Sequence, residues 1–522
     1  MNKRIVIALC GVLLGFCALR AERIMVIADP HVLAPSLMTQ GAALDSMMVG
    51  QRKMIDLSAS VFSALVDTAL THRPDLILIP GDLTKDGEKV SHEWMAAQLA
   101  QLREAGIPTL VIPGNHDIRS TASYAYDGDN KTKVENVTDA EFDAIYASYM
   151  GAMKDAGSHS YVAEPIAGVT VLAMDGSNGN AGEGSLSNNT LNWLLNQADA
   201  ATAKGNMVIA MCHWQLIDHF DQQSVYVAAC QLKNAKTVAQ QLAQHKVHLV
   251  LTGHMHVNDI CTAFYNPTSG TQPDSIVEIG SGSPITYPCP YRWLDIAQDR
   301  ISASVQTDFI SSLDTIPDLY AYSRAWQEEH TENMVPNMSK KLWSKVDAMI
   351  PSSLVNMLSG LPKTDEERAE MFQRHMGSDV VAMYMLHSDG NEPTRPEKDS
   401  IVDAFTLHMS DMMDEVLDNS DLNVLTRAAA EGVMKPLAFS MTEAPVTSMT
   451  EDKTTSDNPK YENRTDDLEL TLELNAPASE QGLENTAHEV LSGSYYDLLG
   501  RPVNQPVSGQ IVIMNNHKQV TK

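Results

Sequence analysis

The sequence has few cysteines and no long internal apolar run. Six cysteines occur among 522 residues, and two of them, Cys10 and Cys17, lie within the first 21 residues. The other four are too few for a disulfide framework, although three pairings among them remain open. Cys212 lies in an apolar run and is expected to be a buried thiol. Without an apolar run of bilayer length, we expect no membrane span inside the chain.

Positive charge is scarce as well. Lysine and arginine number 37 against 66 aspartate and glutamate residues, which gives a formal net charge of −29. A surface this acidic repels polyanions, so binding to a nucleic acid polymer is not expected. A small anionic substrate is compatible with this charge if a local positive centre captures it. The hydrophobic content of 43% is typical of a globular protein, and the length predicts two or three domains.

The N-terminal segment has the layout of a secretory signal peptide. In "MNKRIVIALCGVLLGFCALRAE", a basic start precedes an apolar core, and Ala21 is a suitable cleavage position. We therefore expect residues 1–21 to be a signal peptide and Glu22 to begin the mature chain. Two alternatives are a buried N-terminal strand and a lipoprotein anchored through Cys17. The lipoprotein is disfavoured by the bulky Phe16 at a position that calls for a small residue.

Short apolar runs alternate with helix-like segments in the first half of the chain. The runs are rich in Ile, Val and Leu without strict alternation, which is typical of strands covered on both faces. Apolar residues at helical spacing fill 54–72, 89–105, 191–203 and 227–246. This order predicts a layered α/β domain over residues 22–313 that ends in a hairpin, "WLDIAQDRISASVQTDFI".

The second half is organised differently. Met, Leu and Ala recur at helical spacing in residues 316–441, which predicts an α-helical region of unknown role whose methionine stripes form a core. Residues 442–466 are polar and Thr-rich and are expected to be a linker. Residues 467–522 contain an alternating strand, "DLELTLELN", and predict a small β region.

Polar residues end five of the apolar runs in the first half. Because strand ends in an α/β sheet face a common edge, these side chains are expected to converge. Asp29 and His31, two apart on an extended chain, can face one point. The converging groups are Asp29, His31, Asp82, Asn115, His213, His254 and His256.

All seven groups offer oxygen or imidazole nitrogen, and none is a thiolate. That donor set suits Mn, Fe, Zn, Co or Ni better than a structural zinc site. Seven ligands exceed the needs of one ion, and with one bridging carboxylate they fit two ions about 3.5–4 Å apart. The sequence therefore predicts two divalent metal ions as cofactors.

The motif order resembles the calcineurin-like metallophosphoesterase superfamily. Its D-x-H, G-D, G-N-H-D, H and G-H-x-H blocks stand here as Asp29-Pro30-His31, Gly81-Asp82, Gly114-Asn115-His116-Asp117, His213 and Gly253-His254-Met255-His256. The resemblance covers roughly residues 23–313. It implies a layered α/β sandwich, with two central mixed sheets flanked by helices.

The resemblance also implies roles for single residues. One ion would be held by Asp29, His31 and His256, the other by Asn115, His213 and His254, and Asp82 would bridge them. Hydroxide bridging the two ions would attack phosphorus, and the ions would spread the charge of the transition state. His116 would be the catalytic histidine that protonates the leaving group. Asp117 or Asp86 would orient His116, and the sequence does not decide between them.

The surroundings of the second motif narrow the substrate class. "GDLTKDG" lacks the tyrosine ligand of purple acid phosphatases and the arginine signature of Ser/Thr protein phosphatases, and looks more like the cyclic-nucleotide phosphodiesterase type. The resemblance thus implies an enzyme, a phosphoric ester hydrolase acting on a small phosphodiester or phosphomonoester. The alternative is a catalytically inactive binding protein on the same fold at the cell surface. Within residues 119–165, Tyr124, Tyr126, Tyr146 and Tyr149 suggest either a substrate lid or, as we favour, the packing of an insertion.

The C-terminal tail carries a further resemblance. "YYDLLGRPVNQPVSGQIVIMNNHKQVTK" is similar to the sorting tails of type IX-secreted bacterial proteins in its Tyr496-Asp497, Gly500-Arg501, proline, glycine and aliphatic-strand positions. It departs from them at Val512 and at "NNHK", where an aromatic residue and a Gly-Lys-Lys turn are usual. The alternative is a hairpin that closes a small domain. Together with residues 1–21, the tail predicts export to the periplasm, the cell surface or the medium, with secretion machinery as a partner.

Overall fold

The structure is a computed structural model. It describes residues 21–177, 184–220, 223, 228–267, 273–298, 300–331, 335–350, 352–388, 395–434, 436, 460–463 and 469–473, together with short strands at 495–496, 502–503, 511–514 and 517–520. The predicted signal peptide, apart from Ala21, lies outside the described residues. The chain divides into two compact units, Met1–Asn475 and Ala476–Lys522.

Six strands form the first sheet of unit 1, in the order β16-β14-β13-β1-β2-β3. Strands β1, β2 and β3 run parallel, whereas β13, β14 and β16 extend the sheet antiparallel from β1. The predicted terminal hairpin is β13 and β14. The bounds are β1 Glu22–Val26, β2 Leu76–Pro80, β3 Thr109–Ile112, β13 Pro290–Ile296, β14 Ser302–Phe309 and β16 Glu469–Glu473.

Eight strands form the second sheet, in the order β15-β11-β12-β10-β9-β8-β7-β6. Its centre, β8, β9, β10 and β12, is parallel, and both flanks are antiparallel. The bounds are β6 Met153–Lys154, β7 Tyr161–Ile166, β8 Val169–Met174, β9 Met207–Cys212, β10 Leu249–Thr252, β11 Asp259–Tyr265, β12 Asp274–Gly280 and β15 Lys460–Asn463.

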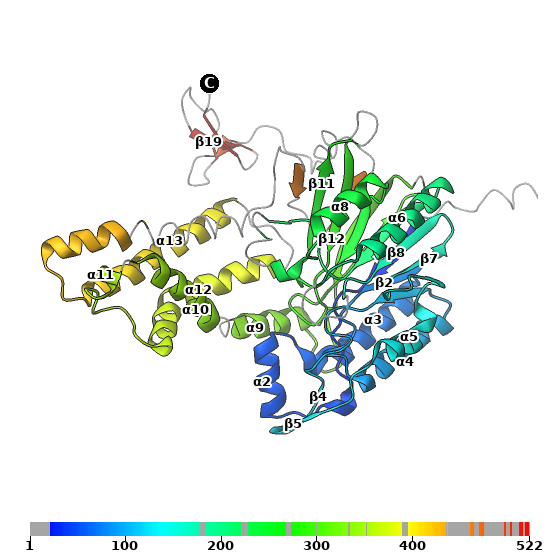
Figure 1. The fold of residues 1–522 in the computed structure, drawn as a ribbon, viewed down its shortest axis with the longest axis horizontal. Coiled ribbons are helices and arrows are strands. Elements are labelled where there is room, and N and C mark those ends of the chain that lie inside the picture. Colours follow the sequence, from blue (N-terminus) through cyan, green and yellow to red (C-terminus); the bar gives the residue numbers. More distant parts are fainter. Residues whose placement is uncertain are drawn as a thin grey trace, which may run out of the picture. The chain divides into compact units, whose positions relative to one another are not determined.

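Alternate residues of the second sheet belong to different cores. Ile209 and Met211 of β9 join the core shared with the first sheet, whereas Val208 and Ala210 join a core with α6 (Asn188–Ala203) and α8 (Ala235–Gln244). This sorting follows from the two-residue period of a strand. Helices α3 (Ser58–His72) and α4 (Lys89–Glu104) pack beside the first sheet (Figure 1). The predicted α/β sandwich, two mixed sheets flanked by helices, is confirmed.

A long connection between β3 and β7 carries the predicted tyrosine-rich insertion. Tyr126, Tyr146 and Tyr149 are at most 4% exposed and belong to the main core, so the packing interpretation is confirmed for these three. Further short elements in the first half are η1 Pro35–Leu37, α2 Ala42–Gln51, η2 Ile55–Leu57, β4 Tyr124–Asp127, β5 Asn130–Lys133, α5 Asp139–Ile145, η3 Ala147–Tyr149 and η4 Ala228–Cys230.

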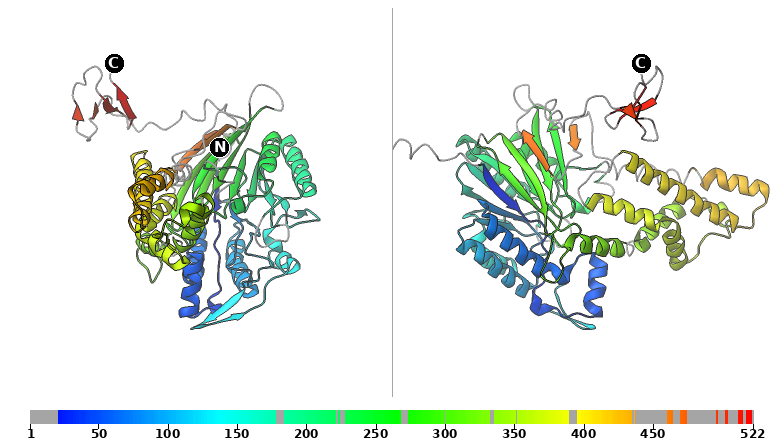
Figure 2. Two further views of the ribbon diagram at one scale, coloured as in Figure 1. Left: turned by 60° about the vertical axis from the view of Figure 1, so that its left-hand side comes forward. Right: turned by 180° about the vertical axis from the view of Figure 1, so that it is seen from behind.

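The predicted helical region contains α9 to α13, which lie together in both views of Figure 2. Six of its methionines, including Met376 and Met412, are buried in one apolar cluster with Trp343 and Phe405. The methionine stripes therefore form a core, as expected. The bounds are α9 Leu319–Thr331, α10 Val335–Met349, α11 Ser352–Val355, α12 Asp365–Ser388 and α13 Arg395–Asp418.

The chain returns to the sandwich after the helices, which differs from the predicted boundaries. Within the predicted linker 442–466, residues 460–463 form β15, which pairs with β11 at the edge of the second sheet. The first strand of the predicted small β region is β16, which pairs with β14 at the edge of the first sheet. The α/β sandwich thus takes one edge strand of each sheet from residues beyond 313.

Unit 2 contains a four-stranded antiparallel sheet in the order β18-β17-β19-β20. The aliphatic strand that the sequence indicated is β19. The bounds are β17 Tyr495–Tyr496, β18 Pro502–Val503, β19 Ile511–Met514 and β20 His517–Val520.

Two remaining expectations concern helices and thiols. Within the described ranges, no single helix combines the length and apolar character of a membrane span, and only α2 with Ile55–His72, bent by 107°, passes that test as a pair. The four cysteines beyond the predicted signal peptide are free thiols, and Cys212 is buried as expected.

Candidate metal centre

All seven predicted ligands lie at one end of the sandwich, because five parallel strands of the two sheets end there. Strands β1, β2 and β3 of the first sheet lead into Asp29 and His31, Asp82, and Asn115. Strands β9 and β10 of the second sheet lead into His213 and into His254 and His256. Residues that are more than 220 positions apart in the sequence therefore meet side by side. The convergence predicted from the strand ends is what the structure shows.

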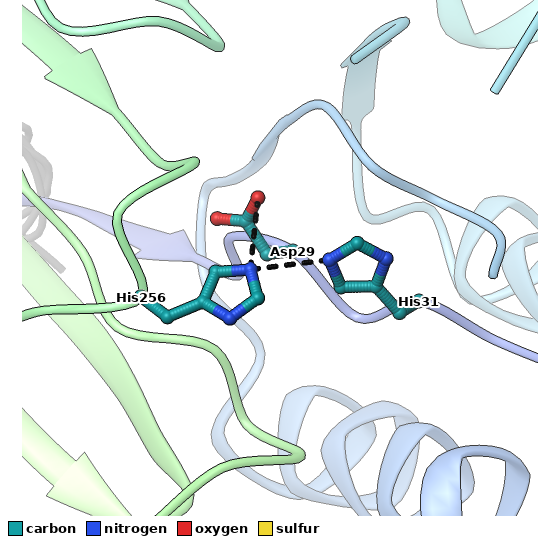
Figure 3. Close-up of side chains that lie close together, drawn as sticks. All are labelled: Asp29, His31 and His256. Carbon is teal, nitrogen blue, oxygen red and sulfur yellow. Dashed lines mark hydrogen bonds and ion pairs between the residues drawn. The ribbon is translucent and has the colours of Figure 1, made fainter. Parts of the chain in front are cut away.

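The first group consists of Asp29, His31 and His256, whose side chains point toward one another (Figure 3). The Nε2 atoms of His31 and His256 are 3.1 Å apart, and Nε2 of His256 is 3.8 Å from Oδ1 of Asp29. Asp29 and His31 are fully buried. Three ligand atoms thus surround one point from two different sheets.

The second group consists of Asp82, His213 and His254. Nε2 of His213 lies 3.0 Å from Nδ1 of His254 and 2.9 Å from Oδ1 of Asn115. The outer nitrogens are held by carbonyls, since His213 Nδ1 donates to Pro80 O at 3.1 Å and His254 Nε2 donates to Ala229 O at 3.3 Å. These bonds fix the rings so that the inner nitrogens face a common point, as in metal-binding histidines.

Asp82 lies between the two groups. Its Oδ2 atom is 3.4 Å from His31 Nε2 and 3.3 Å from His213 Nε2. Its other oxygen accepts the backbone N–H of His116 at 2.9 Å, which fixes the carboxylate plane. One carboxylate oxygen therefore faces both ligand groups, which is the placement that a bridging ligand requires.

The backbone is strained at these ligands. Five of the eleven non-glycine residues with positive φ among the described residues are predicted ligands: Asp29, His31, Asp82, His254 and His256. Residues other than glycine rarely adopt this backbone conformation, and each instance costs on the order of 1–3 kcal/mol. Strain gathered at one group of side chains indicates that their direction matters more than local stability.

Three glycines allow the strands to approach the ligands closely. A methyl group at Gly81 would overlap the ring of His213, at Gly114 the carboxylate of Asp82, and at Gly253 the carboxylate of Asp29. Each motif glycine thus makes room for a ligand delivered by a different strand. This explains the Gly-Asp, Gly-Asn and Gly-His spacing in physical terms.

His116 lies beside the first group and is oriented by Asp86. Its ring centroid is 4.8 Å from that of His31, and its Nδ1 atom is 2.7 Å from Oδ1 of Asp86. The second oxygen of Asp86 contacts the buried ammonium of Lys85. Burial opposes ionisation of Asp86, but its bonds to His116 and Lys85 prevail and lower its pKa, so Asp86 is a carboxylate and accepts the His116 proton.

Asp117 has a different task. Its carboxylate accepts the backbone N–H groups of Leu83, Thr84 and Gly114 at 2.8–3.0 Å. It therefore ties the second motif to the third rather than orienting His116. Of the two residues that the sequence left open, the structure brings Asp86 to His116.

The electrostatics fit a site for cations. Burial lowers the pKa of His254 to about 3 and, with Lys53 nearby, lowers the pKa of His31 and of His256 well below the usual range, so these rings are neutral and can act as ligands. Burial opposes protonation of His213 as well, but Asp82 and Asp29 outweigh it and raise its pKa to about 9. Burial also raises the pKa of Asp29 to about 7. Two carboxyl groups and the protonated ring of His213 thus lie close together. Divalent ions bound there would displace the protons from His213 and Asp29.

Two lysines near these ligands were not singled out in the sequence. Lys85 follows the second motif directly, and its pairing with Asp86 gives it a place in the site. Lys53 precedes η2, and its ammonium lies 2.9 Å from Nε2 of His31. Neither carries a local signal, because a lone lysine in a polar connection is ordinarily a solvated surface residue.

Comparisons with known proteins agree with this site. Residues 22–258 match the family described as calcineurin-like phosphoesterase. A curated relative, a probable cyclic nucleotide phosphodiesterase of Moraxella catarrhalis, is 26% identical over 196 residues, which cover 37% of this chain and 63% of the relative. The chain thus spans less than two thirds of that relative's length.

Two solved structures share low sequence identity with the chain. A dimetal phosphatase from Danio rerio is 12% identical with a TM-score of 0.38, over 55% of this chain and 96% of that one. A purple acid phosphatase from yellow lupin seeds is 10% identical with a TM-score of 0.35, over 55% of this chain and 51% of that one. The residues that match the calcineurin-like phosphoesterase family include all five motifs that carry the candidate ligands.

Proposed function

We propose that this protein is a dinuclear metal-dependent phosphoric ester hydrolase that cleaves a phosphodiester or phosphomonoester of a small molecule. The observation that carries the proposal is the pair of ligand groups, Asp29–His31–His256 and Asp82–His213–His254, which share one end of the sandwich with Asp82 between them. A structural zinc site needs four ligands and is closed. Seven oxygen and nitrogen donors fit two catalytic ions.

Each candidate ligand would have a defined role at one or both ions. Asp29, His31 and His256 would hold one ion, Asn115, His213 and His254 the other, and Asp82 would contact both. Bound divalent ions would make water a hydroxide near neutral pH and offset the charge that develops on the phosphoryl group. Their identity, among Mn, Fe, Zn, Co and Ni, is left open by this donor set.

His116 would supply the leaving-group proton. Because its Nδ1–H donates to the carboxylate of Asp86 at 2.7 Å, Nε2 is the nitrogen left to face a substrate. The ring is 23% exposed, so a departing oxygen can reach it. Proton donation from Nε2 lets the oxygen leave as an alcohol rather than an alkoxide.

A phosphodiester is the substrate class that we favour. The family of the curated relative, named a probable cyclic nucleotide phosphodiesterase, and the motif "GDLTKDG" support this choice. The alternative, an inactive binding protein on this fold, is less well supported, because inactive members would be expected to lose ligands and all seven meet here together with His116.

Hydrolysis of bis-p-nitrophenyl phosphate by the Mn²⁺-loaded full chain tests the proposal. We expect turnover that is lost on chelation and in His254→Ala. His245→Ala is the matched control, because His245 follows the end of α8 and its ring bonds Asp199 of α6, so the change should leave activity unchanged. Absence of turnover together with absence of bound transition metal would favour the binding protein. Activity that survives both chelation and His254→Ala would contradict the two-metal mechanism.

We also propose that the chain is exported. The basic and apolar layout of residues 1–21 and the sorting-like tail beyond Tyr495 support this, and both lie outside the part that carries the site. N-terminal sequencing of the protein from fractionated cells should find Glu22 first in the extracytoplasmic material. An intact N-terminus in the cytoplasmic fraction alone would contradict it.

A further inference from the structure

Lys53 brings an ammonium group to the candidate metal centre from outside all five motifs. It lies in the short connection between α2 and η2, and its Nζ atom is 2.9 Å from Nε2 and 3.4 Å from Nδ1 of His31. It thus reaches the same ring nitrogen that faces His256 and Asp82. Lys53 is the residue in this connection that reaches the ligands.

The backbone on both sides of Lys53 is fixed. Arg52 N–H donates to Met48 O at 2.7 Å and closes α2, while Met54 N–H donates to Ile285 O at 3.0 Å on a distant loop. The Met54 side chain is fully buried. The stem of Lys53 therefore starts from an anchored position and is directed inward, unlike that of a lysine on a solvated surface.

Lys53 has no carboxylate of its own. Among the described residues no carboxylate lies within ion-pair distance of its ammonium, whereas Lys85 pairs with Asp86 and Lys204 pairs with Glu164 at 2.7 Å. The carboxylates that act most strongly on Lys53 are Asp82 and Asp29, which belong to the two ligand groups, followed by Asp86, which already contacts Lys85 and His116. Once cations occupy the two ligand groups, each of these three carboxylates is engaged elsewhere.

A cation on His31 also excludes the ammonium from its present contact. Two positive groups cannot share one ring nitrogen at 2.9 Å, so the flexible four-carbon stem of Lys53 has to turn its head outward. The ring of His116, which is 23% exposed, lies 4.8 Å from the fully buried ring of His31. A substrate phosphoryl group has to lie in this same region if His116 is to protonate its leaving group.

We infer that Lys53 is a substrate-binding residue, whose ammonium contacts a non-bridging phosphoryl oxygen while His116 faces the leaving oxygen. This inference rests on the proposed function. It gives the site an ammonium group that forms no ion pair with a carboxylate among the described residues, in a chain of net charge −29. The ligand chemistry is that of a phosphate ester or free phosphate, which ammonium groups bind as point charges.

Binding of inorganic phosphate to the Mn²⁺-loaded full chain, measured by titration calorimetry, tests the inference. Lys53→Met keeps the stem and removes the charge, and should raise the dissociation constant roughly 10- to 100-fold, the loss of one charged hydrogen bond. Lys53→Arg should stay within about threefold of wild type, because the charge is kept. Lys204→Met removes one positive charge far from the site and should change nothing. In Lys53→Met the KM for the ester should rise together with the dissociation constant of phosphate, and kcat should change by a smaller factor than KM.

The metal content of each variant separates the outcomes. Lys53→Met should bind Mn²⁺ as tightly as wild type or more tightly, because a competing cation has been removed. Loss of Mn²⁺ in Lys53→Met, or unchanged phosphate binding with full metal, would overturn the inference while leaving the proposed hydrolase intact. A wild-type chain that binds no transition metal and cleaves no phosphoester would overturn the proposed function itself.

Discussion

Asp86→Asn isolates the contribution of the carboxylate that orients His116. One oxygen of Asp86 accepts from His116 Nδ1 at 2.7 Å, and the other contacts the ammonium of Lys85. Asp86 is 3% exposed and Lys85 1%, so solvent screens neither contact. Asparagine keeps the shape of the side chain and removes its charge.

The expected loss of activity follows from one buried charged hydrogen bond. Such a bond contributes about 1.5–3 kcal/mol, which corresponds to a fall in kcat of roughly 10- to 150-fold. The loss should appear with alkyl esters, whose leaving oxygen needs a proton. It should be much smaller with p-nitrophenyl esters, because nitrophenolate leaves readily without one.

The variant should also lose stability, for a separate reason. Lys85 would remain as a buried ammonium without its carboxylate partner, which costs about 3–5 kcal/mol when one member of a buried pair is removed. Lys85→Met combined with Asp86→Asn removes the unpaired charge and should recover most of the melting temperature. Activity on alkyl esters should stay low in the double variant.

Two measurements separate the effect of Asp86→Asn on stability from its effect on proton donation by His116. Thermal unfolding of the Mn²⁺-loaded chain reports the Lys85 effect, and kcat on paired alkyl and p-nitrophenyl esters reports the His116 effect. An alkyl-ester kcat within about threefold of wild type would refute the role of Asp86. So would an equal loss on both esters, because that would indicate general damage to the site.

Two further predictions concern a glycine and pH. Gly253→Ala places a methyl group against the carboxylate of Asp29, so elemental analysis should find fewer metal ions per chain. Gly50→Ala in α2, with nothing within 4 Å, should keep the metal content and raise the free energy of unfolding by about 0.5–1 kcal/mol. Full metal content in Gly253→Ala would contradict the close approach. The pKa of His213 is raised from 6.5 to about 9, so the folded metal-free protein keeps this proton in a pH range where the unfolded chain has lost it. The resulting stabilisation is fully present below pH 6.5 and is lost as the pH rises through 9. The metal-free protein should therefore lose about 1 kcal/mol of stability per pH unit between pH 7 and 8, and Mn²⁺ binding at pH 7.5 should release a proton, seen as buffer-dependent calorimetric heats; heats that do not depend on the buffer would argue against this charge state.

The convergence of the seven candidate ligands was predictable from the sequence because each of them follows a buried strand. Parallel strands share one edge, so a polar residue just past the strand needs no knowledge of the rest of the fold to be placed there. His213 shows the limit of this reasoning, since a single histidine after β9 is meaningful only in the company of the other four motifs. The glycines beside the ligands were also recognisable, although which ligand each one touches is a tertiary fact.

Other features depended on contacts that leave no local pattern. From the sequence alone, Asp86 and Asp117 are both plausible partners for His116. They are distinguished by contacts in the fold, since Asp117 accepts three backbone N–H groups and Asp86 accepts from His116. Lys53 reaches His31 because Met54 is bonded to the distant Ile285. Strand β15 reads as a polar linker, "KYEN", because an edge strand has one neighbour and needs no continuous apolar run.

The number of ions bound per chain tests the central claim most directly. Reconstitution of the full chain with Mn²⁺ followed by elemental analysis should give two ions. His256→Ala and His254→Ala should each lose one, and Asp82→Ala should weaken both. One ion or none in the wild-type chain, or equal metal content in all three variants, would contradict the account of two ligand groups that share Asp82.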